Sequence, residues 1–412
     1  MAITLGNVYP AEGNFYPAYN DMVLTATSTN TAQTNFKYVV DVYIAGSQVA
    51  RLKYSPDVNG RLTANVHRII ENYCTYNIDV GDAAFVQCAN SIALFSLHVG
   101  EEYGTTPVVY PNLSNFPTSG TRYAINTSCA WDERLDYLDS TYILAGSSSK
   151  FLSTLNAFDI QASQNAWVHM IRTTTNKPAK MEVKTYDYWG NLLGQYRVAN
   201  AFATVSATAD RFLRFPCGTA NLNLISTGII TVVSGANPII TSSVVSYTIQ
   251  ALDNSNAAMS EVRTYTVTSA SCKYTNYRLH FLNKFGGFDS MNFALVSHET
   301  LLQINKKTYI QPYGTNTAGV WSYTKQDLLT TTIDVEYKHT FEINSDWISD
   351  TQSAWLEELM TSPVVFREIS ATVMEAVNLT TATYQIKKNV TDGLIQLNIR
   401  FENGFNNKRQ RG

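Results

Sequence analysis

Several stretches of the chain alternate apolar and polar residues with a period of two, which predicts β-strands. In residues 36–44 (Phe-Lys-Tyr-Val-Val-Asp-Val-Tyr-Ile) the even-numbered side chains are apolar or aromatic, whereas Lys37 and Asp41 fall on the opposite face. A glycine-containing turn and a second run at 49–54 follow, so we expect a hairpin with one dry face. Residues 333–343 alternate in the same way and predict a strand with one buried and one solvated face.

A further hairpin is predicted at 277–293. Residues 277–282 alternate, Gly286 and Gly287 interrupt the pattern, and residues 288–293 restart it. The glycine pair allows a positive φ or a close backbone approach at the turn. Two glycines can also hold a phosphate, but neither a helix start nor a Walker lysine follows them. We therefore interpret the stretch as a structural hairpin near a domain junction.

Helical spacing of apolar residues is found in two segments, 63–74 and 350–361. Thr63 is the expected N-cap of the first helix, and Ser349 or Asp350 that of the second, which Pro363 ends. The apolar stripes are Val66, Ile69, Ile70 and Tyr73 in the first segment and Trp355, Leu356, Leu359 and Met360 in the second.

These patterns predict a mainly β fold with several β-sandwich-like modules and two short helices. We expect an N-terminal β-domain with a helical insert (1–104), a middle all-β domain (105–272) that begins with a linker up to 117, and a C-terminal β-domain with one helix and a basic tail (273–412). Further strands are predicted at 22–26, 92–99, 167–172, 179–187, 192–198, 211–215, 222–226, 228–233, 244–251, 262–267, 364–369, 384–388 and 394–401, and a strand pair at 299–311.

The composition is low in charge, with 15% charged residues among 412 and a formal net charge of −3. Because soluble chains usually have about 25% charged residues, Thr, Ser, Asn and Tyr must cover much of this surface, as in extracellular or assembled proteins. The charge gives no reason to expect nucleic acid. No run reaches the roughly 18 apolar residues of a membrane span, and the first residues lack the pattern of a secretory signal.

The five cysteines (Cys74, Cys88, Cys129, Cys217 and Cys272) are scattered and form no CxxC pair. We expect them to be buried free thiols in a chain that folds in a reducing compartment.

The densest acidic cluster could gather a cation, but its spacing departs from that of an EF-hand loop. Solvated acids on a loop are the simpler interpretation, and calcium is the alternative that stays open. The cluster consists of Asp132, Glu133, Asp136 and Asp139.

The other candidate residues do not form a predicted site. Glu357 and Glu358 are adjacent on the expected helix and therefore point apart, which is unlike a glycosidase acid–base pair. His67 lies off its apolar stripe with no second ligand at i+3 or i+4. A nucleophile elbow, an HExxH motif, a Walker loop and a Rossmann fingerprint are all missing from the sequence. We predict no catalytic residue, no metal, no organic cofactor and no enzyme activity.

Four stretches resemble structural proteins of tailed phages that infect Bacteroidetes hosts: residues 14–21 (Asn-Phe-Tyr-Pro-Ala-Tyr-Asn-Asp), 36–44, 277–293 and 346–365. The resemblance touches the first and last thirds of the chain and leaves most of the middle uncovered. It implies a virion component built from β-sandwich modules, in the tail or baseplate, and it brings no catalytic residues. It also implies other virion proteins as partners, a homo-oligomer within a symmetric assembly, and assembly in the cytoplasm of the host bacterium.

Three classes of function follow from these observations. A structural subunit fits the composition and the modular β pattern. A receptor- or glycan-binding adhesin of the same particle is the alternative, because exposed Tyr and Trp rings stack on sugars; a β-rich hydrolase comes third. The candidate glycan loops are Tyr188-Trp189-Gly190 and Tyr313 to Trp321, and the basic tail with Lys408, Arg409 and Arg411 is expected to fray or to dock on a neighbouring subunit.

Overall fold

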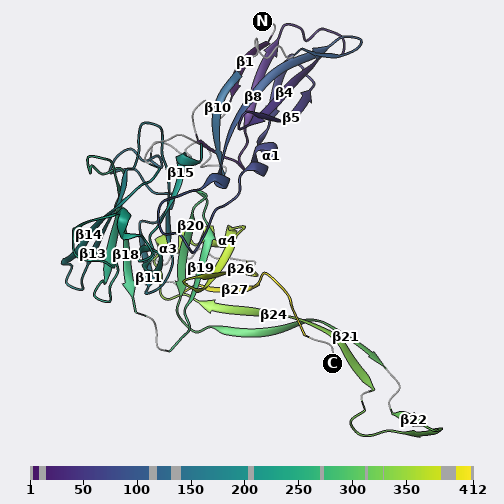
Figure 1. Ribbon diagram of the computed structural model, residues 1–412. Coiled ribbons are helices and arrows are strands. Elements are labelled where there is room, and N and C mark those ends of the chain that lie inside the picture. The colour runs from purple at the N-terminus through teal and green to yellow at the C-terminus, as the bar shows by residue number, and fades with distance from the viewer. Residues whose placement is uncertain are drawn as a thin grey trace. The chain divides into compact units, whose positions relative to one another are not determined.

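The structure, a computed structural model, describes residues 3–8, 15–110, 118–130, 141–202, 208–269, 273–310, 314–327, 329–381 and 396–409. It is mainly β, with several sheets and only a few short helices, which confirms the predicted fold class (Figure 1). The chain forms two compact units: unit 1 contains residues 1–269 and 282–289, and unit 2 contains residues 270–281 and 290–412. The division into three domains stays a prediction. The expected strand at 384–388 lies outside the described residues.

The N-terminal part of unit 1 is a sandwich of two sheets. Alternate side chains of its strands share one core, in which Val40 and Leu97 from one sheet pack with Leu24 and Leu62 from the other. The hairpin predicted at 36–54 is confirmed, and its turn residues Ala45 and Gly46 both have positive φ, as a tight hairpin turn requires. One sheet has the order β1 (Ile3–Val8), β3 (Val23–Ser28), β6 (Arg61–Asn65); the other has the order β2 (Phe15–Pro17), β10 (Thr118–Ile125), β8 (Ile92–Tyr103), β4 (Lys37–Ile44), β5 (Ser47–Tyr54), and β9 (Val108–Tyr110) pairs with β8.

The helix predicted from residue 63 begins later than expected. Residues 61–65 form β6, which pairs with β3, so Thr63 lies inside a strand and caps no helix. Only a short helix follows Val66. It consists of α1 (His67–Ile70) and the 3-10 turn η1 (Glu71–Tyr73).

Two other expectations for this part need correction. Residues 108–110, which fall in the predicted linker, form β9 and pair with β8. Asp41 was expected on a solvated face, yet it is buried, because Arg51 donates two hydrogen bonds of 2.7 Å to its carboxylate and covers it.

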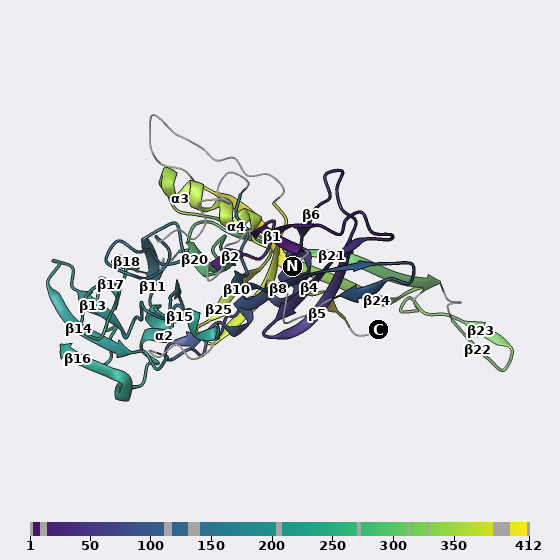
Figure 2. The same ribbon diagram turned by 90° about the horizontal axis from the view of Figure 1, so that it is seen from above.

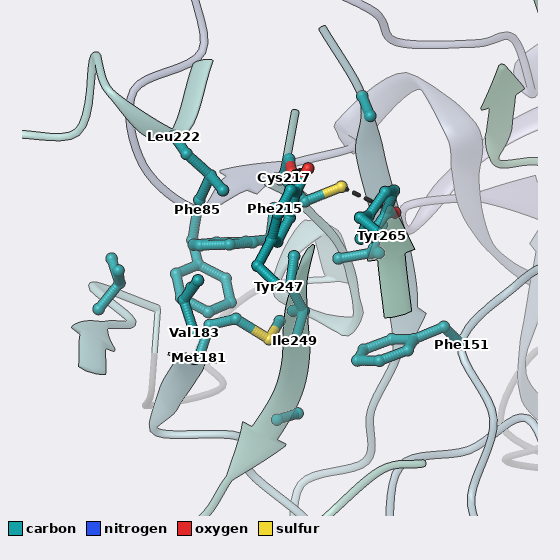
Figure 3. Close-up of a cluster of buried hydrophobic side chains, with 14 of the residues drawn as sticks. Phe85, Phe151, Met181, Val183, Phe215, Cys217, Leu222, Tyr247, Ile249 and Tyr265 are labelled. Atoms are coloured by element: carbon teal, nitrogen blue, oxygen red, sulfur yellow. Dashed lines mark hydrogen bonds between the residues drawn. The ribbon is translucent and has the colours of Figure 1, made fainter. Parts of the chain in front are cut away.

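The second part of unit 1 pairs a six-stranded sheet with a three-stranded sheet around a large core. In Figure 3 the rings of Tyr247 and Tyr265 lie near Cys217, and the two rings stack at 5.0 Å. The Sγ atom of Cys217 lies 3.1 Å from the hydroxyl of Tyr265, and the hydroxyl of Tyr247 donates a hydrogen bond of 2.8 Å to the carbonyl of Cys217, so these polar groups are paired. The six strands have the order β11 (Ala157–Gln161), β18 (Arg263–Thr268), β17 (Ser246–Leu252), β13 (Lys180–Tyr186), β14 (Leu192–Ala199), β16 (Ile230–Ser234), and the three have the order β12 (Trp167–Ile171), β15 (Phe212–Pro216), β7 (Val86–Gln87).

The strand predicted at 222–226 is wrong. This stretch follows a short helix, and its chain is held by turns: the backbone N–H groups of Leu224 and Ile225 bond to carbonyls three residues earlier. The short helices here are η2 (Ala89–Ser91), η3 (Thr208–Arg211), α2 (Thr219–Leu222) and η4 (Thr227–Ile229).

The tip of the hairpin at 277–293 belongs to the core of unit 1. Asn283 holds the turn together: its side chain accepts hydrogen bonds from the N–H groups of Phe285 and Gly287 and donates one of 2.8 Å to the carbonyl of Leu152. Gly286 has φ +79°, and a Cβ there would lie 2.7 Å from the carbonyl oxygen of Asn126. The turn therefore needs glycine at this position, as the sequence suggested.

Unit 2 is built on one eight-stranded sheet. Apolar side chains on alternate positions of its central strands, such as Ile343, Ile399 and Phe401, are fully buried. The sheet has the order β20 (Phe288–Phe293), β19 (Tyr277–Leu282), β25 (Val365–Ser370), β26 (Val373–Leu379), β27 (Asn398–Asn403), β24 (Thr330–Asn344), β21 (His298–Ile310), and β28 (Asn407–Lys408) pairs with β24.

The second predicted helix is confirmed, as two short consecutive helices. Ser349 is the N-cap, and it forms a capping box with Gln352. Trp355, whose ring lies 5.2 Å from that of Phe281, packs the helices against the sheet. The helices are α3 (Asp350–Trp355) and α4 (Glu357–Thr361), and they end before Pro363.

The described part of the basic tail folds back on its own chain instead of fraying. Asn407 and Lys408 pair with Tyr337 and Glu336 of β24. The ammonium group of Lys408 lies 2.8 Å from the carboxylate of Glu336, and the guanidinium of Arg409 lies 5.4 Å from the centre of the Tyr337 ring. These contacts place residues 407–409 within the fold of unit 2.

Candidate interaction surfaces

The strands β21, β22 (Thr315–Thr317), β23 (Val320–Ser322) and β24 form a feature that we call the arm. β21 and β24 run side by side in both views, away from β26 and β27 in Figure 1, and β22 and β23 lie at the far end in Figure 2. β24 pairs with β21 through most of its length but with β27 only through residues 340–344. β28 also pairs with β24, at Glu336 and Tyr337, so the arm is a two-stranded ribbon only beyond these residues, toward β22 and β23.

The arm differs from its predicted form in two ways. The expected strand pair at 299–311 is one strand, β21, all thirteen residues of which are exposed. The expected buried face of β24 is buried only near its end, at Phe341 and Ile343, and the preceding residues are half-buried. The alternation along β24 was predicted correctly, but most of its apolar face is only half-buried in the described part of the chain.

Apolar side chains are exposed along the whole arm. Large exposed apolar patches on soluble proteins usually mark binding sites, and the arm exposes large apolar side chains on both of its faces. Ile310 is 75% exposed, and the other large apolar residues that are exposed here are Leu301, Leu302, Ile304, Tyr309, Val320, Trp321, Tyr323 and Leu329.

A row of rings on one face of β24 connects the core of unit 2 to the arm. The ring of Phe341 stacks on that of Phe401 at 4.9 Å, that of His339 lies 6.4 Å from Phe341, and that of Tyr337 lies 5.7 Å from His339. Burial decreases along this row from Phe341 outward. The row is thus a continuation of the hydrophobic core onto an open ribbon.

One predicted glycan loop lies in the arm. Ala318 and Gly319, both with positive φ, make the tight turn that joins β22 to β23. The rings of Trp321 and Tyr323 lie 5.1 Å apart beside it and are exposed. Tyr313 lies outside the described residues.

The other predicted glycan loop is the turn between β13 and β14 in unit 1. Asp187 organises this turn by accepting hydrogen bonds from the backbone N–H groups of Trp189 and Asn191. Tyr188 and Trp189 are 77% and 81% exposed, and their rings meet edge to face at 5.2 Å. A fixed backbone that holds two open rings suits the stacking of a flat apolar group.

A buried polar network in unit 2 was not visible in the sequence. The Nδ1 atom of His280 lies 2.7 Å from the hydroxyl of Ser290, and its Nε2 atom lies 2.9 Å from the carboxylate of Glu368. Arg278 shares this carboxylate at 3.4 Å. The three strands β19, β20 and β25 bring these residues together, and their register could not be read from the sequence.

The three residues resemble a serine-hydrolase triad in composition but not in arrangement. In such a triad Nε2 faces the serine and Nδ1 faces the acid, and here the two nitrogens are exchanged. His280 is fully buried, and both Ser290 and Glu368 are buried too. A substrate would not reach these groups, and we interpret the network as one that stabilises the pairing of the strands.

We expect the His280 network to make unit 2 less stable as the pH falls below about 6.5. Burial lowers the pKa of His280 from its usual 6.5, and Arg278 adds to this, while Glu368 opposes it. Between the pKa of His280 in the unfolded chain and its lower pKa in the folded chain, only the unfolded chain binds the proton. The free energy of unfolding therefore falls by at most about 1.4 kcal/mol for each pH unit in this range. Urea denaturation at pH 7 and pH 5 measures this loss of stability. The difference between the two pH values should be smaller in His280→Gln than in the unchanged protein. Equal differences in both proteins would contradict the prediction.

A buried ion pair lies in unit 1, between Asp82 and Arg214. The Nε and Nη2 atoms of Arg214 donate hydrogen bonds of 2.6 and 2.9 Å to the two carboxylate oxygens, and the indole N–H of Trp167 donates one of 3.0 Å. Burial raises the pKa of Asp82, and Arg214 opposes this shift. Nearby His169 is also buried, and its pKa lies well below 6.5 because of burial and of the charges of Arg214 and Arg263.

The predicted acidic cluster at 132–139 lies outside the described residues, so its calcium hypothesis stays open. Within the ranges that the structure describes, no group of three or more His, Cys, Asp or Glu side chains could hold a metal ion. His67 lies beside Asn65, with 2.9 Å between Nδ1 and the amide oxygen. Glu357 and Glu358 lie in α4, and only Glu358 is buried.

The described cysteines are buried, as predicted. Cys74 and Cys88 are free thiols, and burial raises the pKa of each to about 12. Cys129 and Cys217 are buried as well, and Cys272 lies outside the described residues. None of the helices in the described ranges has the length and apolar character that crossing a membrane requires.

Comparison with known proteins gives no family. No model of a protein family matches the chain, and no curated protein matches its sequence. Among solved structures it is similar to the ectodomain of the teleost fish polymeric Ig receptor, with 8% sequence identity and a TM-score of 0.15, over 64% of this chain and all of that one. A likeness this weak carries no argument about fold or function.

Proposed function

We propose that the chain is a structural subunit of a phage virion, in the tail or baseplate, and that it works by protein–protein assembly. The resemblance of its first and last thirds to structural proteins of tailed phages supports the phage part of this proposal. The arm supports the assembly part. Its partners would be other virion proteins and further copies of the chain, joined in the cytoplasm of the host bacterium.

The observation that carries the assembly role is the exposed apolar surface of the arm. A two-stranded hairpin is only marginally stable by itself in water. The arm nevertheless places Leu301, Leu302 and Ile304 in solvent, beside a ring row that continues from the core. A neighbouring protein that covers these side chains would stabilise both the arm and the contact.

Labelled particles test this function. A peptide epitope inserted between Asn254 and Ser255, in an exposed turn of unit 1, leaves the arm and the tail unchanged. We expect negative-stain images of phage particles to show antibody fragments in a ring or collar, with untagged particles as the control. Absence of the chain from purified particles would refute the proposal, and label at the distal tip alone would favour an adhesin.

An adhesin of the same particle is the second candidate, and the exposure of Tyr188 and Trp189 favours it. Trp189→Ala should change the free energy of unfolding by less than about 0.5 kcal/mol, because the ring packs against little of the fold. If the loop binds a host glycan, this variant loses binding to host cells, and Trp321→Ala tests the loop in the arm in the same way. Unchanged cell binding by both variants would exclude these loops as glycan sites.

A further inference from the structure

The outer edge of β21 is open. β24 pairs along one side of this strand, and no strand in the described ranges pairs along the other. In an antiparallel pair every second residue directs its backbone N–H and C=O away from the partner strand. β21 therefore presents hydrogen-bonding groups to solvent over thirteen exposed residues.

Only half of this edge carries the lysines that normally prevent strand addition. Lysines and bulges protect open edges, and β21 has Lys306 and Lys307 together with shifts of register after Gln303 and after Lys307. The half that precedes Lys306 has no lysine and exposes Leu301, Leu302 and Ile304. It pairs regularly with β24 from His298 to Gln303, and its one shift of register falls at Ile304. An exposed apolar edge of this kind is a template for another extended strand.

The charges of β21 favour a second β21 in antiparallel orientation. Glu299 lies near the start of the strand, and Lys306 and Lys307 lie near its end. An antiparallel copy brings each Glu299 close to the lysines of the other chain and places the leucines and Ile304 of both chains together at the centre. A parallel copy would instead set like charges side by side, which is unfavourable. The strand is thus complementary to itself in one direction only.

We infer that β21 pairs with β21 of a second copy, antiparallel and about a twofold axis at Gln303, which joins the sheets of two chains and sets each Glu299 opposite Lys307 of the other copy. This inference rests on the proposed assembly function and specifies one of its contacts. A twofold contact uses the same patch on both chains, and here the patch supplies two sets of opposite charges and one shared apolar centre. Glu299 already bonds to His339 at 2.7 Å, which holds its carboxylate at the arm.

Charge exchange in the purified full-length chain tests the pairing. Sedimentation equilibrium at low salt should show a dimer, and Glu299→Lys alone, or Lys306→Glu with Lys307→Glu, should weaken it by about tenfold or more. The triple variant with all three exchanges should restore it, because the opposite charges meet again. Melting curves of the four proteins should agree closely at a concentration low enough for each to be monomeric, because all three residues are exposed and the surface contact of Glu299 with His339 contributes little.

A cysteine near the axis gives a second measurement. Gln303→Cys should form a disulfide-linked dimer on mild oxidation, because a twofold axis places the residue near its own copy. The matched control Asn254→Cys, exposed in unit 1, should not. A chain that stays monomeric, or a triple variant that does not recover the dimer, would overturn the inference.

The outcome is separable from that of the proposed function. If particles carry the epitope label but the triple variant does not recover the dimer, the assembly function is supported and the self-pairing of β21 is wrong. If the dimer forms but the chain is absent from particles, the self-pairing of β21 is supported and the proposed function is wrong.

Discussion

Replacing Arg214 by alanine is expected to lower the free energy of unfolding of unit 1 by about 3–5 kcal/mol. The change leaves the carboxylate of Asp82 buried without its cationic partner, with only the indole of Trp167 as a described hydrogen-bond donor. The pKa of Asp82, which burial already raises, should then rise further, because Arg214 is the group that opposes the shift. Urea denaturation combined with hydrogen exchange of peptides from β12 and β15 measures the loss within unit 1.

The matched control is Arg68→Ala. Arg68 is exposed and lies 3.5 Å from Glu71, so its removal should cost no more than about 0.5 kcal/mol. The double variant Asp82→Asn with Arg214→Met should recover part of the loss, because it leaves no unpaired charge and keeps an acceptor for Trp167. Equal losses for Arg214→Ala and Arg68→Ala would show that the buried pair does not stabilise this unit.

Phe285→Ala should destabilise unit 1 by a comparable amount, about 3–5 kcal/mol. The ring is buried at the tip of the β19–β20 hairpin, in a cluster with Leu152 and Phe212, and lies 4.4 Å from the ring of Tyr142. Its removal leaves a cavity that the bonded turn around Asn283 cannot close. Denaturation midpoints and faster exchange in peptides that contain Leu152 would report this loss.

Phe405→Ala removes the same side chain from an exposed position in unit 2 and serves as the control. It should change the free energy of unfolding by less than about 0.5 kcal/mol. If Phe285→Ala is as mild as Phe405→Ala, the hairpin tip is not part of the core of unit 1.

The sequence predicts an element correctly where residues close together in the chain determine its structure. The hairpin at 36–54 and the helix after Ser349 follow from alternation, turn residues and a cap that lie within a few positions of each other. The apolar spacing of Val66, Ile69 and Ile70, extended back to Thr63, predicts a helix that overlaps the end of β6. Residues 61–65 instead form a strand because they pair with β3. The sequence signal for this strand is the period of two in β6, in which Leu62 and Ala64 are buried.

Contacts between distant residues could not be predicted in this way. His280 and Glu368 are 88 positions apart, and only the register of β19 and β25 brings them together. The alternation of 333–343 was likewise correct as a strand pattern, but the pattern shows which face is apolar and not what covers it. The openness of the arm is therefore a finding of the structure alone.

Unit 1 is incomplete during synthesis of the chain until a late segment leaves the ribosome. Residues 1–269 leave the ribosome before 282–289, although both stretches belong to the same compact unit. Until the later stretch emerges, the cluster around Leu152 and Phe212 lacks the ring of Phe285 and exposes apolar surface, the condition under which nascent chains need chaperones. A fragment cut at residue 272, the boundary that the sequence predicts, would keep that surface open permanently, and a fragment that retains unit 1 intact must extend through Asp289.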